Sequence, residues 1–461
     1  MDMKARIITL MCAAALLSSC HIYQKYERPD DLVTEGLYRD LSDDTSVDEL
    51  NFGDVPWREV FTDPQLQALI EEALANNANL RSAALTVEQA QAQLTAARLA
   101  YLPLFQFAPS GTLTTVEGGS WSKTYQVGVS GQWTIDLFAS LLNSNRNAKV
   151  TYQQSKYYQQ AVQTQIIASV ATVYYTLLML DRNLEISIDM SKLLERTVDT
   201  MQEMTNLSYA NAASVEQARA GYAQVVASLS DIKQNIREME NTMCLMLNKP
   251  AQAIARGKLA DQHLPTQFAA GVPLQLLSNR PDVQAAEMAL AGSYYDTNRA
   301  RAAFYPQVTI SGQAGWTNNL GVITNPGKFL ASFVGSLTQP LFYRGQLVAA
   351  LKAAKANEEK SKLQFQTALL NAGNEVSNAL YEYEMCQEKA AARDMQVTSA
   401  KNASDYTQEL FQLGTSTYLE VLSAQNSYLS AQISQVSDTF AEMQAVVALY
   451  QALGGGREIE N

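Results

Sequence analysis

The chain has few of the residues that carry enzymatic or metal chemistry. Its 461 residues include two histidines, His21 and His263, and four cysteines. No group of histidine, cysteine and carboxylate residues has metal-ligand spacing, and no glycine-rich phosphate loop follows a predicted strand. Beyond Cys20 only Cys244 and Cys386 remain, which is too few for a disulfide framework. We therefore expect small buried thiols, no catalytic residue, no metal site and no cofactor.

Charge and long apolar runs are also scarce. Charged residues make up 17% of the chain, which is below the roughly 25% typical of soluble domains. The net charge of −12 argues against nucleic acid as a partner. No uninterrupted run of about 18 apolar residues occurs, so we expect no membrane-spanning helix. If the chain crosses a bilayer, it must do so as β-structure.

The N-terminus has the pattern of an export signal. Lys4 and Arg6 precede an apolar stretch at 7–17, which is too short to span a bilayer. Residues 17–20 (LSSC) resemble the lipobox of bacterial lipoproteins. The resemblance implies removal of a signal peptide at 1–19 and acylation of Cys20, with palmitate among the chains. Several acyl chains on one residue anchor stably, so residues 20–62 are expected to form a lipid-anchored extended segment.

The rest of the chain repeats itself. Residues 97–103 (ARLAYLP) return as 300–306 (ARAAFYP), an offset of 203, and further on Val215 matches Val421 at an offset of 206. A period near 200 is too long for a solenoid repeat. We interpret it as a duplicated domain-sized unit at 63–250 and 273–456, with a linker at 251–272 and a tail at 457–461.

Each unit is predicted to begin with a helix and a β-hairpin. Asp63-Pro64 is a helix start signal, and the first helix is expected to continue to about Ala100. Alternating apolar and polar residues predict hairpins at about 104–136 and 307–340. In the second hairpin we expect a loop containing Asn318-Asn319 and residues 325–327, then a return strand at about 330–339. Each strand has about 10 residues, enough to cross a bilayer when tilted.

A long helical hairpin is expected to follow each β-hairpin. The tracts at about 140–249 and 345–453 contain no proline and very little glycine. The helical pattern of each tract is interrupted once, at 207–211 and at 413–417. Helices this long imply coiled-coil packing. Apolar residues occupy only part of each helix, which suits a wall with a wet inner face. Trp133 and Trp316 on the strands fit an interfacial girdle, although single aromatic residues are common in strands.

Two hairpins supply four membrane strands, which cannot close a barrel around a passage. An open sheet edge in lipid would leave backbone groups unsatisfied. Closure must come from other copies of the chain, and cyclic symmetry is the usual arrangement. Three copies would supply twelve strands and a lumen. The sequence therefore predicts an oligomer, and this argument alone does not fix the number of copies at three.

Several motifs resemble one family. Asp136-Leu137-Phe138, residues 300–306 and the terminal residues 449–456 (LYQALGGG) are similar to outer-membrane efflux proteins, in the lipidated TolC-like branch that includes OprM and NodT. The resemblance implies an α+β membrane protein, a homotrimer with a twelve-stranded outer-membrane β-barrel continued by a periplasmic α-helical barrel. It also implies a periplasmic adaptor (membrane fusion) protein and an inner-membrane pump of the resistance-nodulation-division (RND) type as partners.

The same resemblance implies roles for the helix tips. It places a gating apolar ring at Leu419 and lumen carboxylates at Glu420 or Ser423, of which only Glu420 is acidic here. Three converging Glu420 side chains would attract cations, whereas a solvated helix face is the usual place for a lone glutamate. Adaptor contact is expected at the two tips, at Leu413, Gly414, Thr415, Ser416, Ser208 and Tyr209. Ser208 stands where its counterpart is glycine, so the first tip is expected to differ in shape.

The leading hypothesis is a passive exit duct for drugs and similar small solutes in the outer membrane of a Gram-negative bacterium, with most of the chain in the periplasm. An exit duct of a type I protein secretion system is an alternative in the same class. A lipid-anchored periplasmic coiled-coil scaffold or adaptor is an alternative from another class, and it predicts no membrane-spanning hairpins. An enzyme is disfavoured because no catalytic constellation is present.

Overall fold

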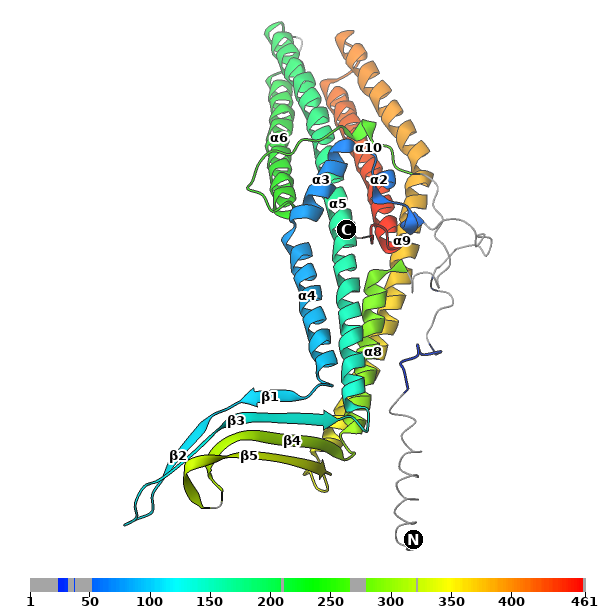
Figure 1. The fold of residues 1–461 in the computed structure, drawn as a ribbon. Coiled ribbons are helices and arrows are strands. Elements are labelled where there is room, and N and C mark those ends of the chain that lie inside the picture. Colours follow the sequence, from blue (N-terminus) through cyan, green and yellow to red (C-terminus); the bar gives the residue numbers. More distant parts are fainter. Residues whose placement is uncertain are drawn as a thin grey trace. The chain divides into compact units, whose positions relative to one another are not determined.

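The computed structural model describes residues 24–31, 37, 52–208, 211–265, 279–320 and 322–458. Long helices and one sheet dominate this part of the chain (Figure 1). In chain order the elements are η2 (Phe52–Asp54), α2 (Trp57–Val60), α3 (Pro64–Asn76), α4 (Ala78–Leu99), β1 (Leu104–Phe107), β2 (Ser110–Thr114), β3 (Ser122–Ile135), α5 (Ser140–Asn206), α6 (Ala212–Met246), η3 (Leu259–Asp261), α8 (Pro281–Ala302), β4 (Gln307–Asn319), β5 (Ile323–Thr338), α9 (Gln346–Gln412) and α10 (Tyr418–Ala452).

The chain divides into two compact units, each built from both halves of the sequence. The first unit comprises residues 1–32, 85–156 and 285–367, and it contains the sheet. The second unit comprises residues 33–84, 157–284 and 368–461, and it contains both helical hairpin tips. The boundary between the units falls within α4, α5, α8 and α9. The two compact units therefore do not coincide with the two sequence repeats.

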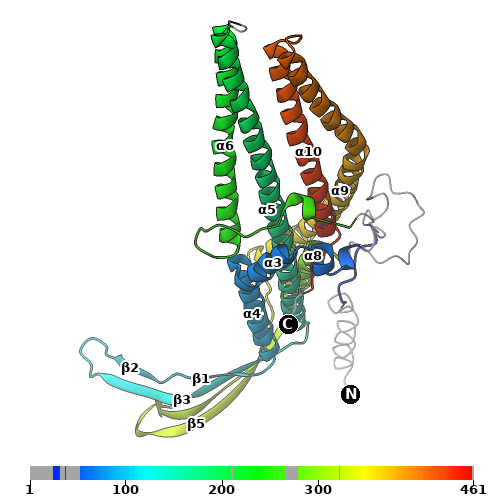
Figure 2. The ribbon, with the colours of Figure 1, turned by 90° about the horizontal axis from the view of Figure 1, so that it is seen from above.

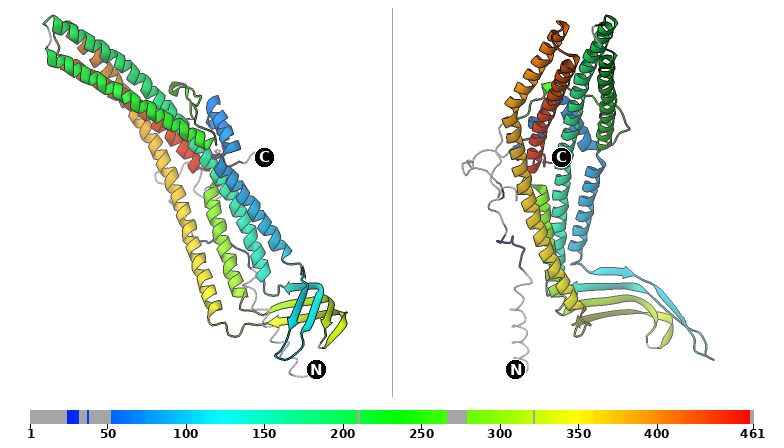
Figure 3. Two further views of the ribbon diagram at one scale, coloured as in Figure 1. Left: turned by 90° about the vertical axis from the view of Figure 1, so that its left-hand side faces the viewer. Right: turned by 180° about the vertical axis from the view of Figure 1, so that it is seen from behind.

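The sheet of the first unit is antiparallel and has the order β1-β3-β4-β5, with β2 also paired to β3. β1 and β2 are thus two pieces of one edge position, interrupted at Ala108-Pro109. Proline has no N–H to donate, so it is tolerated at such an edge interruption. Figures 2 and 3 show the strands as one curved sheet. The sheet therefore has four strand positions, as predicted from two hairpins.

Two expectations about local structure are wrong. The first helix does not run unbroken to Ala100, because Asn77 is extended and its side chain accepts a hydrogen bond from the N–H of Asn79 at 2.9 Å, starting α4 anew. The expected loop at 325–327 lies instead within β5, which begins at Ile323. Pro326 is accommodated there because β5 is an edge strand.

The central strands approach closely at one pair of glycines. Gly128 of β3 lies directly opposite Gly315 of β4. A Cβ atom on Gly315 would lie 2.4 Å from the Cα of Gly128, and a Cβ on Gly128 would lie 2.4 Å from the carbonyl oxygen of Ala314. Both positions therefore require glycine, since any side chain would push the two strands apart.

The long helices are the helical hairpins expected from the tracts without proline. α5 and α9 each have 67 residues, and α6 and α10 each have 35. Their bounds differ by 206 residues throughout, the same offset that the sequence repeat shows. In the second unit each hairpin is a pair of adjacent antiparallel helices (Figures 1 and 3). The equal lengths support a duplicated origin for the two halves.

By length and composition, one helix among the described residues, α5, could cross a membrane. We expected none, because the chain lacks an uninterrupted apolar run. Most of the apolar stretch of α5 is buried inside the protein. Tyr174, Tyr175, Leu177 and Leu178 of this helix have 1% or less of their surface exposed. α5 is therefore apolar because it forms the core of the second unit.

The beginning and end of the second unit close on each other. The ring of Tyr450 is buried and packs edge-to-face against Phe52 at 5.4 Å and Phe61 at 5.7 Å between ring centres. Its hydroxyl donates to the backbone oxygen of Val55 at 2.7 Å. Arg457 forms an ion pair with Asp54. Aromatic burial of this kind is a large contribution to the stability of a fold, and here it joins segments almost 400 residues apart.

Candidate functional site

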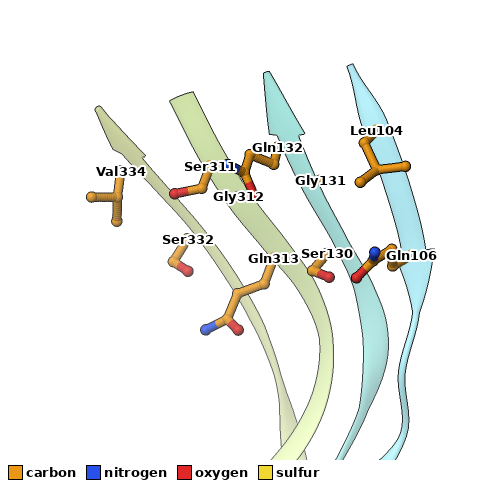
Figure 4. A pocket seen from close by; sticks show the side chains of 10 residues that line it. All are labelled: Leu104, Gln106, Ser130, Gly131, Gln132, Ser311, Gly312, Gln313, Ser332 and Val334. Atoms are coloured by element: carbon orange, nitrogen blue, oxygen red, sulfur yellow. The ribbon is translucent and has the colours of Figure 1, made fainter. Parts of the chain in front are cut away.

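The sheet has one polar face and one apolar face. Successive side chains of a strand point to opposite sides, and the register aligns equal faces of neighbouring strands. One cross-strand row of the polar face is Gln106, Ser130, Gln313 and Ser332, and the next is Leu104, Gln132, Ser311 and Val334. Figure 4 shows these side chains together on one side of the strands. They line a hollow of about 290 Å³.

The polar face is almost without charge. Its side chains on the described strands are amides, hydroxyls, glycines and a few apolar groups, and Lys328 is the single ionisable residue among them. Lys328 lies opposite Thr317, towards the end of the sheet that is far from the helices. Gln126 donates to Gln313 at 2.9 Å, which ties adjacent strands within this face. The surface can therefore hydrogen-bond solutes without selecting them strongly by charge.

The opposite face is apolar and exposed. Phe105, Val129, Trp133, Trp316 and Phe333 all belong to it, and between 42% and 82% of the surface of each is accessible. Exposed apolar surface on this scale marks contact with a membrane or a partner. The indole N–H of Trp133 donates to the backbone oxygen of Tyr101 at 2.9 Å near the helical end of β3. Trp316 packs edge-to-face on Phe329 nearer the other end. The two tryptophans thus lie at different levels of one apolar band.

The edges of the sheet are unpaired within the chain. β1 and β2 pair only with β3, and β5 pairs only with β4, in the part of the chain that the structure describes. Each edge therefore has backbone N–H and C=O groups that no neighbouring strand uses. In hydrocarbon such groups cost several kcal/mol each, so this sheet needs neighbours at both edges.

One described residue at each hairpin tip has a left-handed backbone conformation. Gly414 has a φ of 75°, and Ser208, its counterpart at an offset of 206, has a φ of 66°. The prediction that the first tip differs in shape is therefore not reflected in this dihedral angle. Tyr209 lies outside the described residues. Leu413 is 77% exposed, and the N–H and the hydroxyl of Thr415 both donate to the backbone oxygen of Leu410, each at 3.0 Å.

The residues proposed for the gate lie at the start of α10. Leu419 is 64% exposed, and Glu420 and Ser423 are also exposed. The carboxylate of Glu420 accepts hydrogen bonds from the Ser416 hydroxyl at 2.5 Å and the Thr417 N–H at 2.8 Å. With Thr417 as the N-cap, this is a capping box. The bond from Ser416, followed by that from Thr417, lowers the pKa of Glu420.

An apolar cluster holds the two tips together. Met201 of α5, Val215 and Ala218 of α6, Phe411 of α9, and Tyr418 and Val421 of α10 are all buried in it. Phe411 and Tyr418 pack edge-to-face at 6.4 Å between ring centres. The four helices of one chain therefore meet next to the residues proposed for the gate. In the sequence, only the helical spacing of these apolar side chains indicates that they could form such a cluster.

Ion pairs join elements of the second unit away from the hairpin tips. Arg256 binds Asp181 of α5 through two nitrogens, at 2.5 and 2.9 Å, and Glu240 of α6 at 2.7 Å. Hydrogen bonding to Asp181 is the main cause that raises the pKa of Arg256. In α9 and α10, Arg393 and Lys389 both pair with one carboxylate, that of Asp438. Sequence reasoning missed these pairs because the partners are distant along the chain.

The N-terminal segment 24–31 lies along helices of the first unit. Arg28 forms a bidentate pair with Glu287 of α8 at 2.7 and 2.8 Å. Asp31 accepts from Lys362 of α9 at 2.5 Å. Arg146, near the start of α5, donates to the backbone oxygen of Gln24 at 3.0 Å. Cys20, the residue proposed for lipidation, lies outside the described residues.

Reactive and metal-binding groups are sparse among the described residues. Cys244 and Cys386 are both free and buried, and desolvation raises the pKa of the Cys386 thiol. No group of three or more histidine, cysteine and carboxylate side chains in the described ranges is placed to hold a metal ion. The surfaces with a distinctive chemistry are therefore the sheet and the helix tips.

Comparisons with known proteins identify the family. The family model "Outer membrane efflux protein" matches residues 69–249 and 272–455. The cation efflux system protein CusC of Escherichia coli O6:H1 is 27% identical over 96% of this chain and 97% of its own. The probable efflux pump outer membrane protein TtgC of Pseudomonas putida is 26% identical over 98% of this chain and 96% of its own.

A solved structure shows the same architecture. The open state of the MtrE outer membrane channel of Neisseria gonorrhoeae superimposes with a TM-score of 0.82 and 26% identity, covering 94% of this chain and 98% of that one. The sheet with two unlike faces and the long helical hairpins are thus the parts of a known channel fold. The chain belongs to the outer membrane efflux protein family, and it is an outer-membrane exit duct for efflux.

Proposed function

We propose that three copies of this chain form the exit duct of a tripartite RND-type efflux pump. The observation that carries the proposal is the sheet, with a polar face, an apolar face and two unpaired edges. Pairing the β1/β2 edge of one copy with the β5 edge of the next satisfies both edges and removes them from lipid. Three copies give about twelve strands and a lumen, which four strands cannot.

The polar face then lines the lumen, and the apolar face meets lipid. The chain acts as a transporter component rather than an enzyme, and the energy comes from the partner pump in the inner membrane. CusC and TtgC carry names for different efflux systems at nearly equal identity, which fits a duct whose neutral lining leaves cargo selection to the pump.

The partners meet the chain at its helical end. A periplasmic adaptor is proposed to contact Leu413, Gly414, Thr415, Ser416, Ser208 and Tyr209 at the tips, and the rings of Leu419 and Glu420 would narrow the passage there. Leu419 is exposed within one chain, so convergence of three copies would bury it. The capping box holds the Glu420 carboxylate towards its own turn. We therefore assign the apolar part of the closure to Leu419.

Acylation of Cys20 would anchor the same assembly to lipid. Gln24 is held near the start of α5, next to the end of the sheet. Four residues span at most about 14 Å, so an anchor on Cys20 would reach the membrane beside the sheet. This position supports an outer-membrane lipoprotein whose lipid lies at the periplasmic side of its own barrel.

Single-channel conductance in planar bilayers tests the duct. Ser130→Asp places three carboxylates in the proposed lumen, and Ser130→Asn is the neutral control of similar size. We expect the aspartate variant to shift the reversal potential in a salt gradient towards cation selectivity, while the asparagine variant leaves it unchanged. Equal selectivity of both variants, in channels that conduct, would show that the polar face does not line the passage.

Two further variants test the gate. If Glu420 faces the passage, Glu420→Gln lowers cation selectivity without widening the pore. If the capping box keeps it out of the passage, selectivity stays as in the wild type, and Leu419→Ser alone raises the conductance. No change in either variant would remove both residues from the constriction.

A further inference from the structure

The second unit contains two equivalent joints between helices. At the first joint the end of α6 meets the start of α4, where the side-chain amide of Asn77 donates to the backbone oxygen of Met246 at 2.8 Å. At the second joint the end of α10 meets the start of α8, where Arg280 donates to the backbone oxygen of Ala452 at 3.2 Å. The two donors are counterparts at the offset of 203, and the two acceptors are counterparts at the offset of 206. The same contact is therefore made once in each repeat.

The second joint is charged, whereas the same positions of the first are neutral. Arg280 donates to both carboxylate oxygens of Asp282 in α8, at 2.6 and 3.0 Å, and to Glu375 in α9 at 2.6 Å. Its side chain is only 9% exposed. In the first repeat the counterparts of these two acids are Asn79 and Ser169. The arginine and both of its acids are thus absent together from the first joint.

The first joint has ion pairs nearby, but they connect other elements. Lys249 pairs with Glu72 of α3. Arg256 pairs with acids of α5 and α6, within the first hairpin. Neither pair involves α4, whereas the guanidinium of Arg280 contacts α8, α9 and α10 at once. The two hairpins therefore differ in how their shorter helix is fastened at its base.

We propose that Arg280 is a positioning residue for the periplasmic closure, because it holds the base of α10 and so sets where Leu419 and Glu420 lie at the other end. The proposal rests on the gate proposed above for these two residues. α9 is one continuous helix of 67 residues, so α10 is the arm of the second hairpin that ends at a joint. The buried cluster at the tips holds the other end of α10.

The length of α10 makes its far end sensitive to the joint. α10 has 35 residues and is about 50 Å long, so a tilt of about 5° at its base displaces its far end by about 4 Å. Hydrogen bonds between an arginine and carboxylates are strong and fixed in direction. A neutral amide, as at Asn77, restrains the same contact less. The charged joint is therefore found on the hairpin arm that carries the residues of the gate.

Exchanging the joint residues tests the proposal. The variant with Arg280→Asn, Asp282→Asn and Glu375→Ser gives the second joint the neutral residues of the first, which already form a joint in this fold. We expect its single-channel conductance to rise by about twofold or more, because a displacement of about 4 Å at each of three tips widens the narrowest part of the passage.

A spin label near the start of α10 reports its position directly. Asn426 is exposed, so Asn426→Cys can be labelled, and distances between copies are measured by double electron–electron resonance. Cys244 and Cys386 are buried, and we expect them to stay unlabelled. In the exchanged variant the mean distance between copies should increase by about 6 Å, since a tilt of about 5° moves this residue outward by about 3 Å in each copy.

The reciprocal exchange is the matched control. Asn77→Arg, Asn79→Asp and Ser169→Glu place the charged set at the first joint and leave the second joint as it is. We expect the label distance and the conductance of the wild type, because the base of α10 is unchanged. If the larger side chains prevent folding, Lys249→Met, which removes an ion pair next to the same joint, replaces this control with the same expectation.

Three results would overturn the proposal. An unchanged label distance in the exchanged variant would mean that Arg280 does not set the position of α10. A longer distance with the conductance of the wild type would mean that this end of α10 is not the closure. Equal effects of the exchange and its control would mean that any change at a joint loosens the tips. Labels that show no distance between copies would instead mean that the copies do not assemble, and this outcome alone would also remove the proposed function.

Discussion

Arg256 is expected to hold the linker after the first helical hairpin in place. Its side chain is 13% exposed, and its partners Asp181 and Glu240 are 38% and 14% exposed. The same segment is fastened by the Gly257 N–H, which donates to Tyr174 at 3.0 Å. Replacing the arginine by methionine keeps the apolar stem and removes the charge, so two carboxylates lose their partner.

The cost follows from how far each carboxylate can return to water. Removing one partner of a fully buried pair costs about 3–5 kcal/mol. Glu240 stays enclosed, whereas Asp181 is partly exposed and can rehydrate, so we expect about 2–3 kcal/mol. In local opening this corresponds to roughly 30- to 150-fold faster amide exchange. Arg182→Met is the control, because its pair with Glu185 is 48% and 60% exposed and such pairs contribute at most about 1 kcal/mol.

Hydrogen–deuterium exchange, measured by mass spectrometry on peptides covering 251–262, gives the change in amide exchange rate for Arg256→Met and for Arg182→Met. We expect a large increase for Arg256→Met and less than about fivefold for Arg182→Met. Adding Glu240→Gln to Arg256→Met should recover part of the protection, because the enclosed charge is removed. Equal exchange in the two single variants would refute the assignment of Arg256 as the fastening of this segment.

Three further predictions concern the tips and the closure of the second unit. Ser208→Gly should slow amide exchange at the first tip by relieving about 1 kcal/mol of left-handed strain, whereas Ser208→Ala should not. Bonds from Ser416 and Thr417 lower the pKa of Glu420, so the cap's contribution is present above the ordinary glutamate pKa and is lost as pH falls through the lowered value. Proteolysis of the second tip should therefore increase on acidification in the wild type, and Glu420→Gln should abolish this dependence. Gly455→Ala places a methyl group 2.4 Å from the Tyr450 ring, so its thermal unfolding temperature should fall, whereas that of Gly335→Ala, with open space around it, should not.

The architecture follows from patterns that are local in the sequence. The tracts without proline predict long helices, and period-two alternation predicts strands with one polar and one apolar face. The two errors have local causes as well. Asn77 ends one helix and caps the next with its own side chain, and Pro326 is tolerated because β5 is an edge, which alternation does not reveal. Pro109 in the sequence indicates the break between β1 and β2.

The contacts that fix the site are not local. Arg256 and Arg28 each pair with carboxylates tens to hundreds of residues away, and composition gives no sign of which acid each one meets. The role of Glu420 could be predicted in part from the sequence. Its position three residues after Thr417 is the capping-box spacing, so the sequence alone contained a structural explanation beside the gate. The convergence of three Glu420 side chains is a property of the assembly. Within one chain, only the unpaired edges of the β-sheet indicate that other copies are needed.

The closure of Phe52 and Phe61 by Tyr450 has a consequence for biogenesis. An exported chain emerges N-terminus first, so the rings of Phe52 and Phe61 remain uncovered until α10 has been exported. A product truncated before Tyr450 would keep both aromatic surfaces and the partner of Arg457 exposed. The packing of Tyr450 on Phe52 and Phe61 thus forms only after the last helix has been made, so a truncated copy lacks this contact between the two ends of the second unit.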